Sequence, residues 1–434
     1  MDRTLALALL RAVLERNTTL DDALAKLPPA EPRDRASAHR MAACVLRRLG
    51  TLDAVIEPFL RRAPPPVVRL ILALGAAQLL FLQTPAHAAV ATSVDLTREA
   101  GFAAHAGLVN AVLRKVNGEG AEILASLDLP RLDTPLWLWA AWGERARAIA
   151  EAQSEEAPID LTLKNAEVVA PEGGELLPNG SWRYPAGTRV MELGGFESGD
   201  FWVQDEAATL PARLLAAQPG ETIADLCAAP GGKTAQLVAA GARVTAVERD
   251  PKRVVRLREN LARLGMEAEI VTADAAIWKP AGLLDAVLLD APCSATGTIR
   301  RHPDVAHLKK AQDIPALVAM QGRLIAAAAG MLRPGGRMIY AVCSLQPEEG
   351  EGHIRDAEAA GLVFSAFSEA ELAFDARTRH PLGWLRTDPA MGMDGPRRVV
   401  VAMGPALSTT RGSRARGTRN AAQSPSSHSP RRMS

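Results

Sequence analysis

Cysteine is scarce in this chain of 434 residues, which contains four. Four cysteines are too few for a disulfide scaffold in a chain of this length. None of them forms the C-x-x-C pair that is typical of zinc ribbons, and the histidines lack metal-binding spacing. We therefore expect reduced thiols, no metal site and a cytoplasmic location.

Long apolar runs are also missing. The longest, Leu70–Leu82, covers about 13 residues and contains Gln78, whereas a membrane-spanning helix needs about 20 residues. The apolar stretch at the N-terminus meets Arg11 and is not followed by a small-residue cleavage site. The sequence thus predicts no membrane partner, and a buried helix for the long apolar run.

Net charge is small, because 50 Lys and Arg stand against 49 Asp and Glu. The distribution is uneven: residues 406–434 contain six Arg and no acid, so the preceding chain is net acidic. The composition of this Arg/Ser-rich tail predicts disorder. The tail either adds salt-dependent attraction to a nucleic acid or is a dispensable extension.

The first half of the chain divides into two predicted regions. Residues 1–130 have apolar positions three and four apart, interrupted by proline pairs and triplets, which predicts an all-α bundle. Residues 131–204 predict a helical linker and a small β-containing subdomain. The linker carries a Trp cluster, which we interpret as a domain-interface anchor; the subdomain has β-type runs at Ile159–Leu163 and Thr188–Leu193. The cluster consists of Trp137, Trp139 and Trp142.

Residues 205–405 alternate apolar strands with helical patterns, which predicts a doubly wound α/β domain with a mainly parallel, Rossmann-like sheet. In such sheets ligands bind beyond the carboxyl ends of the strands. The predicted strands are Thr222–Cys227, Val244–Glu248, Ala268–Val271, Ala286–Asp290 and Arg337–Cys343.

Acidic residues stand at the first four of these strand ends: Asp225, Glu248, Asp274 and Asp290. Glu248 follows Asp225 by 23 residues, a spacing at which an acid typically binds a ribose diol. Four acids in order suit a nucleoside of neutral or positive charge such as S-adenosylmethionine. The glycine-rich loop after the first strand would approach this ligand with its backbone; it consists of Cys227, Ala228, Ala229, Pro230, Gly231, Gly232 and Lys233.

Two other nucleotide-binding motifs are incomplete. Gly232-Lys233-Thr234 resembles the end of a phosphate-binding P-loop, but position 227, where the first glycine would fall, is a cysteine. The loop also lacks the G-x-G-x-x-G pattern of nicotinamide-binding proteins. A P-loop NTPase is thus a disfavoured alternative that nucleotide binding would test.

The fourth and fifth predicted strands lead to Cys293 and Cys343. Methylation at C5 of a pyrimidine requires such a thiol, since C5 becomes nucleophilic only after a thiolate adds at C6. Asp290 is placed to supply a proton near N3. Asp290-Ala-Pro-Cys293 also differs from the aromatic motif that enzymes methylating exocyclic amines carry here. The pattern alone does not rank the two cysteines.

Several motifs resemble those of known families. Asp290-Ala-Pro-Cys-Ser294, Ala341-Val-Cys-Ser344 and the Cys227–Lys233 loop are similar to the RNA cytosine-C5 methyltransferases. The first 130 residues, with Gly107-Leu-Val-Asn-Ala-Val-Leu-Arg114, resemble the NusB-like RNA-binding bundle. Together these regions resemble the ribosomal RNA small subunit methyltransferase B family, which modifies 16S rRNA.

The resemblance implies that Cys343 is the nucleophile and that Cys293 assists product release. It also implies that the Cys227–Lys233 loop, with three of the strand-end acids, binds S-adenosylmethionine; these acids are Glu248, Asp274 and Asp290. Substrates other than 16S rRNA, namely tRNA or 23S rRNA, remain alternatives, as does an RNA-binding factor with a vestigial catalytic domain. The resemblance leaves open whether free rRNA or a partly assembled subunit is the substrate.

We expect the enzyme to be a monomer. Two pairs of residues are candidate RNA contacts. Arg300 and Arg301 begin a basic cluster just after the Asp290–Ser294 motif, where phosphate contact is expected. Lys164 and Asn165 replace an Arg-Val-Asn pattern that is common in the family.

Overall fold

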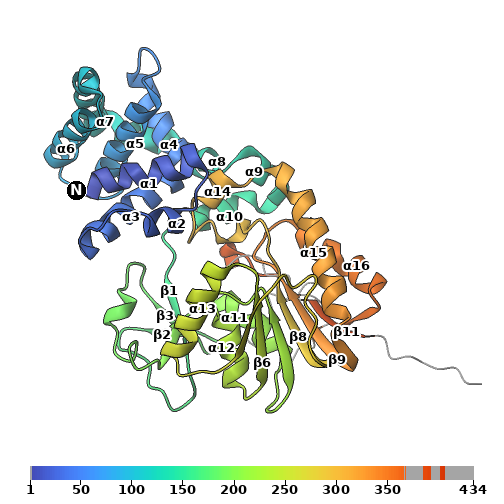
Figure 1. The fold of residues 1–434 in the computed structure, drawn as a ribbon. Coiled ribbons are helices and arrows are strands. Elements are labelled where there is room, and N and C mark those ends of the chain that lie inside the picture. Colours follow the sequence, from blue (N-terminus) through green and yellow to red (C-terminus); the bar gives the residue numbers. More distant parts are fainter. Residues whose placement is uncertain (1, 366, 368–384, 392–400, 406–434) are drawn as a thin grey trace, which may run out of the picture.

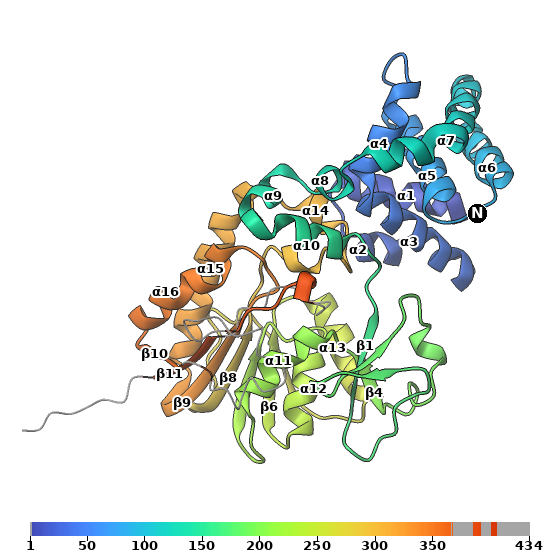
Figure 2. The same ribbon diagram turned by 180° about the vertical axis from the view of Figure 1, so that it is seen from behind.

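The computed structural model describes residues 2–365, 367, 385–391 and 401–405 (Figure 1). The Arg/Ser-rich tail, residues 406–434, lies outside these ranges. A helical bundle, a small antiparallel sheet and a larger α/β sheet follow one another along the chain, and the same arrangement is seen from behind in Figure 2.

The N-terminal region is helical, as expected. Its central helix α5 contains most of the long apolar run, and Ile71, Leu72 and Leu74 are completely or almost completely buried in it. Pro66 opens this helix at a position where its missing amide N–H costs no hydrogen bond. The helices are α1 (Asp2–Arg16), α2 (Leu20–Ala25), α3 (Pro32–Arg47), α4 (Leu49–Ile56), α5 (Pro66–Leu80), α6 (Ala86–Glu99) and α7 (Ala106–Ser126). Within the described ranges, no helix is both long and apolar enough to cross a membrane.

Three short helices link the bundle to the rest of the chain: α8 (Leu129–Asp133), α9 (Leu136–Trp142) and α10 (Ala146–Gln153). Trp142 of the Trp cluster is buried in a small core that also contains Ile299 and Leu345 of the α/β domain. This contact is the expected interface anchor. Trp139 differs from that expectation in part, since its ring also lies beside the guanidinium groups of Arg131 and Arg147.

The small sheet has the strand order β2-β3-β1-β4 with antiparallel pairing throughout. Its strands are β1 (Ile159–Leu163), β2 (Glu175–Leu176), β3 (Trp182–Tyr184) and β4 (Phe201–Val203). The strand predicted over Thr188–Leu193 is wrong, because the chain forms a 3-10 turn at Val190–Glu192. Gly187 and Gly195 have φ angles of 81° and 93°, so the extended run is interrupted on both sides before it can pair.

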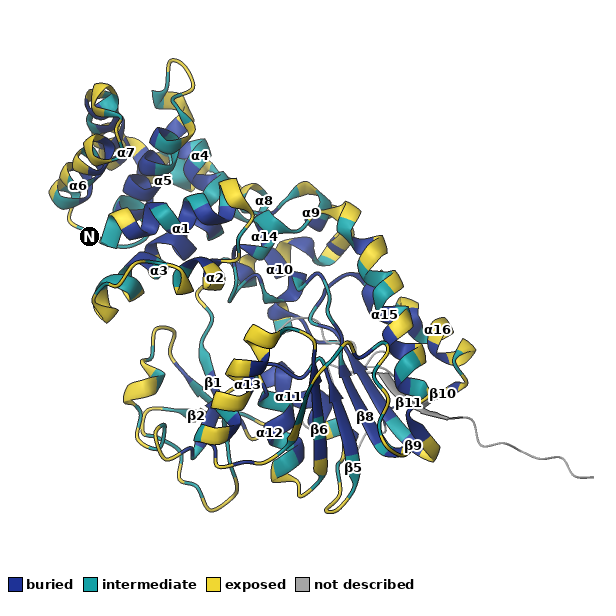
Figure 3. Cartoon of the chain, viewed as in Figure 1, coloured by how far each residue is buried: buried dark blue, intermediate teal, exposed yellow. Residues whose placement is uncertain are grey.

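The large sheet has the order β10-β11-β9-β8-β5-β6-β7, and its strands β5 to β9 run parallel. The direction of the strand order reverses between β5 and β8, which is where doubly wound sheets bind ligands. Figure 3 shows the central strands as the most deeply buried part of the domain. The strands are β5 (Thr222–Leu226), β6 (Arg243–Glu248), β7 (Glu269–Thr272), β8 (Leu284–Asp290), β9 (Leu332–Ala341), β10 (Leu362–Ser365) and β11 (Val401–Pro405).

The predicted Rossmann-like architecture is therefore confirmed, with one shift that affects the site. Strand β9 begins earlier than expected and ends at Ala341, so Cys343 lies in the loop after the strand. The helices of the domain are α11 (Glu206–Leu215), α12 (Gly232–Ala239), α13 (Pro251–Arg263), α14 (Val305–Leu308), α15 (Ile314–Ala329) and α16 (Ile354–Ala359).

The segment after β8 connects the α/β domain to the bundle (Figures 1 and 2). Asp304 accepts a hydrogen bond from the backbone N–H of Leu20 at 3.0 Å, and Arg47 donates to the carbonyl of Arg300 at 2.9 Å. The ring of His307 is 2.8 Å from the carbonyl of Leu46. The bundle thus fixes a segment that begins beside Cys293.

Candidate active site

The Cys227–Lys233 loop leaves β5 at the strand-order reversal and runs directly into α12. Cys227 and Gly231 have positive φ angles of 63° and 106°, which turn the chain sharply. A Cβ at Gly231 would come within 2.6 Å of the side chain of Leu257 in α13. Glycine is required here because the loop packs closely on that helix while presenting the first amides of α12.

Three carboxylates surround this loop. Burial raises the pKa of Asp225 to about 7, and the negative charges of Asp290 and Glu248 act in the same direction. The hydrogen bond that Thr234 donates to Asp225 at 2.6 Å has the opposite effect and lowers this pKa. Burial, followed by these same three carboxylates, raises the pKa of Cys227 to about 12. The loop therefore lies beside three acidic side chains, an arrangement that suits a bound cation.

The fourth strand-end acid is separate from this group. Asp274 is exposed after β7, where its carboxylate accepts a hydrogen bond from the backbone N–H of Ala276 at 2.9 Å. Glu248, in contrast, is 2% exposed and forms an ion pair with Arg253 at 3.1 Å. Asp225, Glu248 and Asp290 thus lie close enough to influence one another, whereas Asp274 lies one strand further out.

A cavity of about 430 Å³ opens between the α/β domain and the small sheet. Its lining includes the Cys227–Lys233 loop, Asp290, Arg300 and Arg301, together with Trp202 beside β1. Glu248, Asp274 and the two strand-end thiols are not among the lining residues of this cavity, and neither are Lys164 and Asn165. The cavity therefore borders one side of the loop.

Lys233 and Asp290, which both line this cavity, form an ion pair with 2.6 Å between Nζ and Oδ2. Lys233 belongs to the predicted cofactor loop, and its pairing with Asp290 is a feature of the structure alone. No sequence signal could have found it, because 57 residues separate the partners and only the parallel pairing of β5 with β8 brings their loops together.

The two strand-end thiols lie side by side. Cys293 Sγ is 3.3 Å from Cys343 Sγ, and the backbone N–H of Cys343 donates to Cys293 Sγ at 3.2 Å. Both cysteines are half-buried, and no disulfide bond joins them. The hydrogen bond with Cys343, then burial, raises the pKa of Cys293 well above its ordinary value. The protonated form of Cys293 is thus favoured, and a proton can be shared between the two sulfurs.

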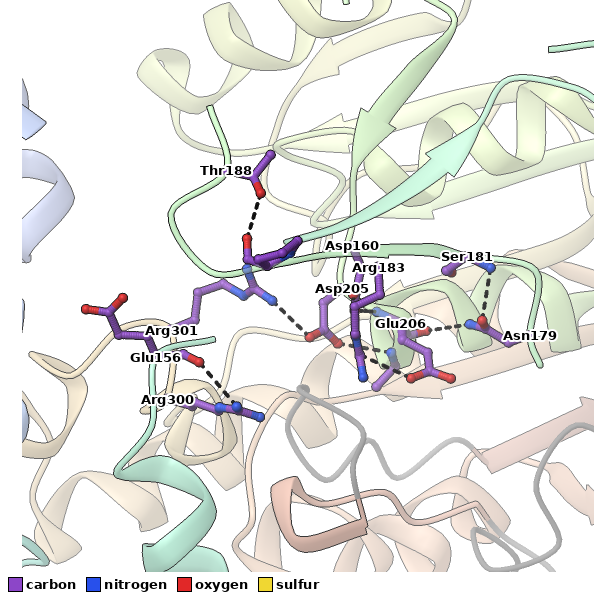
Figure 4. A network of polar contacts seen from close by, with 12 residues as sticks. Glu156, Asp160, Asn179, Ser181, Arg183, Thr188, Asp205, Glu206, Arg300 and Arg301 are labelled. Carbon is purple, nitrogen blue, oxygen red and sulfur yellow. Dashed lines mark hydrogen bonds and ion pairs between the residues drawn. The ribbon is translucent and has the colours of Figure 1, made fainter. Parts of the chain in front are cut away.

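The predicted RNA-contacting residues make contacts inside the protein. Arg300 donates to the carbonyl of Glu156 at 3.2 Å, and Arg301 donates to Asp205 at 3.4 Å (Figure 4). Burial lowers the pKa of Arg300. Both guanidinium groups still line the cavity, so they remain predicted contacts for RNA.

Lys164 and Asn165 follow β1 and are not among the residues that line the cavity. The Lys164 ammonium donates to the carbonyl of Leu264, just after α13. Asn165 is exposed and accepts hydrogen bonds from the amides of Glu167 and Val168. Their assignment to RNA stays a prediction. Among the residues that the structure describes, no group of three potential metal ligands occurs.

Both halves of this arrangement match known families. Residues 212–363 match the family described as 16S rRNA methyltransferase RsmB/F, and residues 1–118 match the NusB family. The ribosomal RNA small subunit methyltransferase B of Xanthomonas campestris pv. campestris is 37% identical over 380 residues, which cover 81% of this chain and 86% of that protein. The protein of the same name from Pseudomonas putida is 35% identical over 428 residues, covering 91% and 96%. The chain belongs to the ribosomal RNA small subunit methyltransferase B family.

Solved structures share the fold. The crystal structure of PH0851 has a TM-score of 0.71 at 20% identity, over 93% of this chain and 99% of that one. A methyltransferase homolog protein from Pyrococcus horikoshii has a TM-score of 0.51 at 24% identity, over 62% and 93%. Family membership makes the protein an rRNA methyltransferase that uses S-adenosylmethionine.

The residues at the strand-order reversal fit this donor. S-adenosylmethionine carries a sulfonium cation, and the carboxylates of Asp225, Glu248 and Asp290 converge on the loop that would hold it. The buried Oδ1 of Asp225 has no hydrogen-bond partner among the described residues, so one polar atom there is left for a ligand to satisfy. These acidic side chains are thus appropriate for binding a cationic nucleoside.

Proposed function

We propose that this protein methylates C5 of a cytosine in 16S rRNA through a covalent adduct between Cys343 and C6 of the base. The observation that carries the proposal is the juxtaposition of two thiols, 3.3 Å apart, in the loops that follow neighbouring parallel strands. The Lys233–Asp290 ion pair belongs to the same end of the sheet. Relatives that cover most of the chain are small-subunit rRNA methyltransferases by name.

The first step forms a bond between the Cys343 sulfur and C6. The thiolate supplies the electron pair, and the pyrimidine ring carries the added charge toward C5 and N3. S-adenosylmethionine supplies the electrophilic methyl group when bound. Cys343 suits the nucleophilic role because it lies in the loop beyond β9, outside the hydrogen-bonded strand.

Asp290 and Lys233 would manage the charge at N3. Their ion pair joins an ammonium donor and a carboxylate acceptor, so the Lys233 ammonium can give a proton to N3. The pair then carries one negative charge beside the base and takes the proton back when the product leaves. Fixed, charged hydrogen-bonding groups of this kind stabilise charge that develops during a reaction. The proton supply that the sequence assigned to Asp290 is thereby shared with Lys233.

Cys293 would assist the release of the product. Loss of the C5 proton to a base returns its electron pair to the ring and breaks the bond between C6 and Cys343. A thiol that keeps its proton and lies 3.3 Å from that sulfur can donate to the departing thiolate. Without this donor the adduct should persist.

The cavity beside Lys233 and Asp290 would admit the RNA. Arg300 and Arg301 line it and would contact phosphates, while Lys164 and Asn165 would contact RNA further out along the small sheet. We take residues 1–130, 131–204 and 205–405 as the RNA-binding bundle, the linker with its subdomain, and the catalytic domain. The enzyme would act as a cytoplasmic monomer on free or partly assembled 16S rRNA.

The test uses labelled S-adenosylmethionine with undermethylated 30S subunits or 16S rRNA. Cys343→Ala should abolish methyl transfer, whereas Cys293→Ala should accumulate a covalent complex of protein and RNA that survives denaturation. Cys44→Ala is the matched control, because this thiol is buried in the helical bundle. Methylation of tRNA or 23S rRNA, without methylation of 16S rRNA, would identify that RNA as the substrate in place of 16S rRNA.

Full transfer activity in Cys343→Ala would overturn the nucleophile assignment. If every variant and the wild type bound RNA without transferring a methyl group to any of these RNAs, the catalytic proposal would fail in favour of an RNA-binding factor.

A further inference from the structure

A buried polar network lies directly behind the two thiols. Each thiol is followed in the chain by a serine, Ser294 after Cys293 and Ser344 after Cys343. Both serines are completely or almost completely buried, and so is Glu349 in the turn after β9. We call Ser294, Ser344 and Glu349 the serine clamp.

The hydrogen bonds of the serine clamp have a defined direction. Ser294 donates its backbone N–H to Glu349 Oε1 at 2.8 Å and its hydroxyl to Glu349 Oε2. A carboxylate accepts and cannot donate, so the hydroxyl proton of Ser294 is committed to Glu349. The two serine oxygens are 2.9 Å apart, and Ser344 must therefore donate to Ser294. The backbone N–H of Gln346 completes the chain by donating to Ser344 at 2.9 Å.

Glu349 is itself held from the opposite side. Gln321 of α15 donates to Glu349 Oε1 at 3.1 Å and to the carbonyl of Pro292 at 2.8 Å. Its amide oxygen is 2.9 Å from the ring nitrogen of His353, and the hydroxyl of Tyr340 donates to the Glu349 carbonyl at 2.6 Å. The carboxylate is thus held by α15, and the backbone of Glu349 is held by β9.

Burying a carboxylate is costly unless hydrogen bonds compensate for the lost water, and an apolar side chain could fill the same space. What the carboxylate provides here is a fixed geometry for two loops that are 50 residues apart in the chain. None of the hydrogen bonds of Glu349 goes to a thiol. Its influence on the positions of the cysteines passes through the serines next to them and through Gln321, which also holds the Pro292 carbonyl beside Cys293.

We propose that Glu349 is a positioning residue, which sets the separation of Cys293 and Cys343 by anchoring both Cys-Ser loops through Ser294 and Ser344. This inference rests on the proposed function of the two thiols. A separation of 3.3 Å keeps the Cys293 proton within reach of the Cys343 sulfur, so the clamp prepares both the attack on C6 and the later release. The charge of Glu349 also contributes to the raised pKa of Cys293, after the hydrogen bond with Cys343 and burial.

The test compares full-length Glu349→Gln and Ser344→Ala with the wild type. Glu348→Gln is the matched control, because Glu348 is the adjacent glutamate and is exposed. Steady-state methyl transfer to unmethylated 16S rRNA gives kcat and KM, equilibrium binding gives the Kd for S-adenosylmethionine, and circular dichroism reports folding. RNA containing 5-fluorocytidine traps the covalent adduct, since its C5 carries fluorine in place of the proton that must leave.

In both clamp variants we expect kcat and the rate of adduct trapping to fall on the order of 10²-fold, the cost of misplacing reacting groups by about 1 Å. KM for RNA and the Kd for S-adenosylmethionine should not change, because the clamp contacts neither the cavity nor the Cys227–Lys233 loop. The pH dependence of the trapping rate should shift in Glu349→Gln and stay unchanged in Glu348→Gln.

Wild-type kcat in both clamp variants would overturn the inference. If Glu349→Gln failed to fold, Ser344→Ala alone would decide, because it removes one hydroxyl and leaves the hydrogen bonds of Glu349 in place. Full activity of Ser344→Ala would then show that Glu349 has only a structural role. Absence of any adduct in the wild type would instead refute the proposed function, and the clamp would then have no thiol chemistry to position.

Discussion

The buried carboxylate of Asp225 predicts an unusual pH dependence of stability. Its pKa is about 7 in the folded protein, against about 3.9 in an unfolded chain. Between these values the folded protein holds the proton that the unfolded chain has lost, so the free energy of unfolding falls as pH rises. Each pH unit costs about 1.4 kcal/mol, or about 2 kcal/mol between pH 5.5 and pH 7.

Asp225→Asn isolates this contribution, because an amide of the same shape does not ionise and its oxygen can still accept from Thr234. Urea unfolding of both proteins, followed by Trp fluorescence from pH 5.5 to pH 8.5, gives the difference in unfolding free energy at each pH. The difference should move by about 2 kcal/mol in favour of the variant up to pH 7 and become constant well above it. Parallel curves across the whole range would refute the argument, since Asp225 would then be ionised in the folded protein already at pH 5.5.

Three further substitutions test other parts of the structure. Arg183→Ala removes the bidentate partner of the buried Asp160 and should lower the free energy of urea unfolding by about 3–5 kcal/mol; a loss below 1 kcal/mol would contradict a buried ion pair. Lys233→Met should reduce single-turnover methyl transfer on the order of 10²-fold or more, and unchanged transfer would exclude the ammonium from the reaction. Asp304→Ala leaves the amide of Leu20 without its acceptor, which should cost about 1–3 kcal/mol and speed proteolytic separation of the bundle; an unchanged cleavage rate would show that this contact does not hold the interface.

The sequence identified the parts of the site because each depends on local pattern. Apolar strands followed by acids, thiols and a glycine-rich loop are readable one segment at a time, since strand periodicity and loop chemistry are short-range properties. Asp290, Cys293 and the Cys227–Lys233 loop were all located in this way. The strand predicted at Arg337–Cys343 differs from β9, which spans Leu332–Ala341. The end of β9 depends on its pairing with β8 and β11, which the local pattern does not show.

The sequence by itself thus determined the family, the order of the elements and the residues that we propose carry the chemistry. Tertiary structure alone decided which of these residues meet. Lys233 reaches Asp290 because β5 pairs with β8, the two thiols approach because β8 pairs with β9, and Glu349 joins their loops from a turn beyond both strands. The physical reason is that a hydrogen bond or an ion pair requires separations of about 3 Å. Strand pairing sets such distances, and the sequence of one segment does not indicate which distant segment will lie beside it.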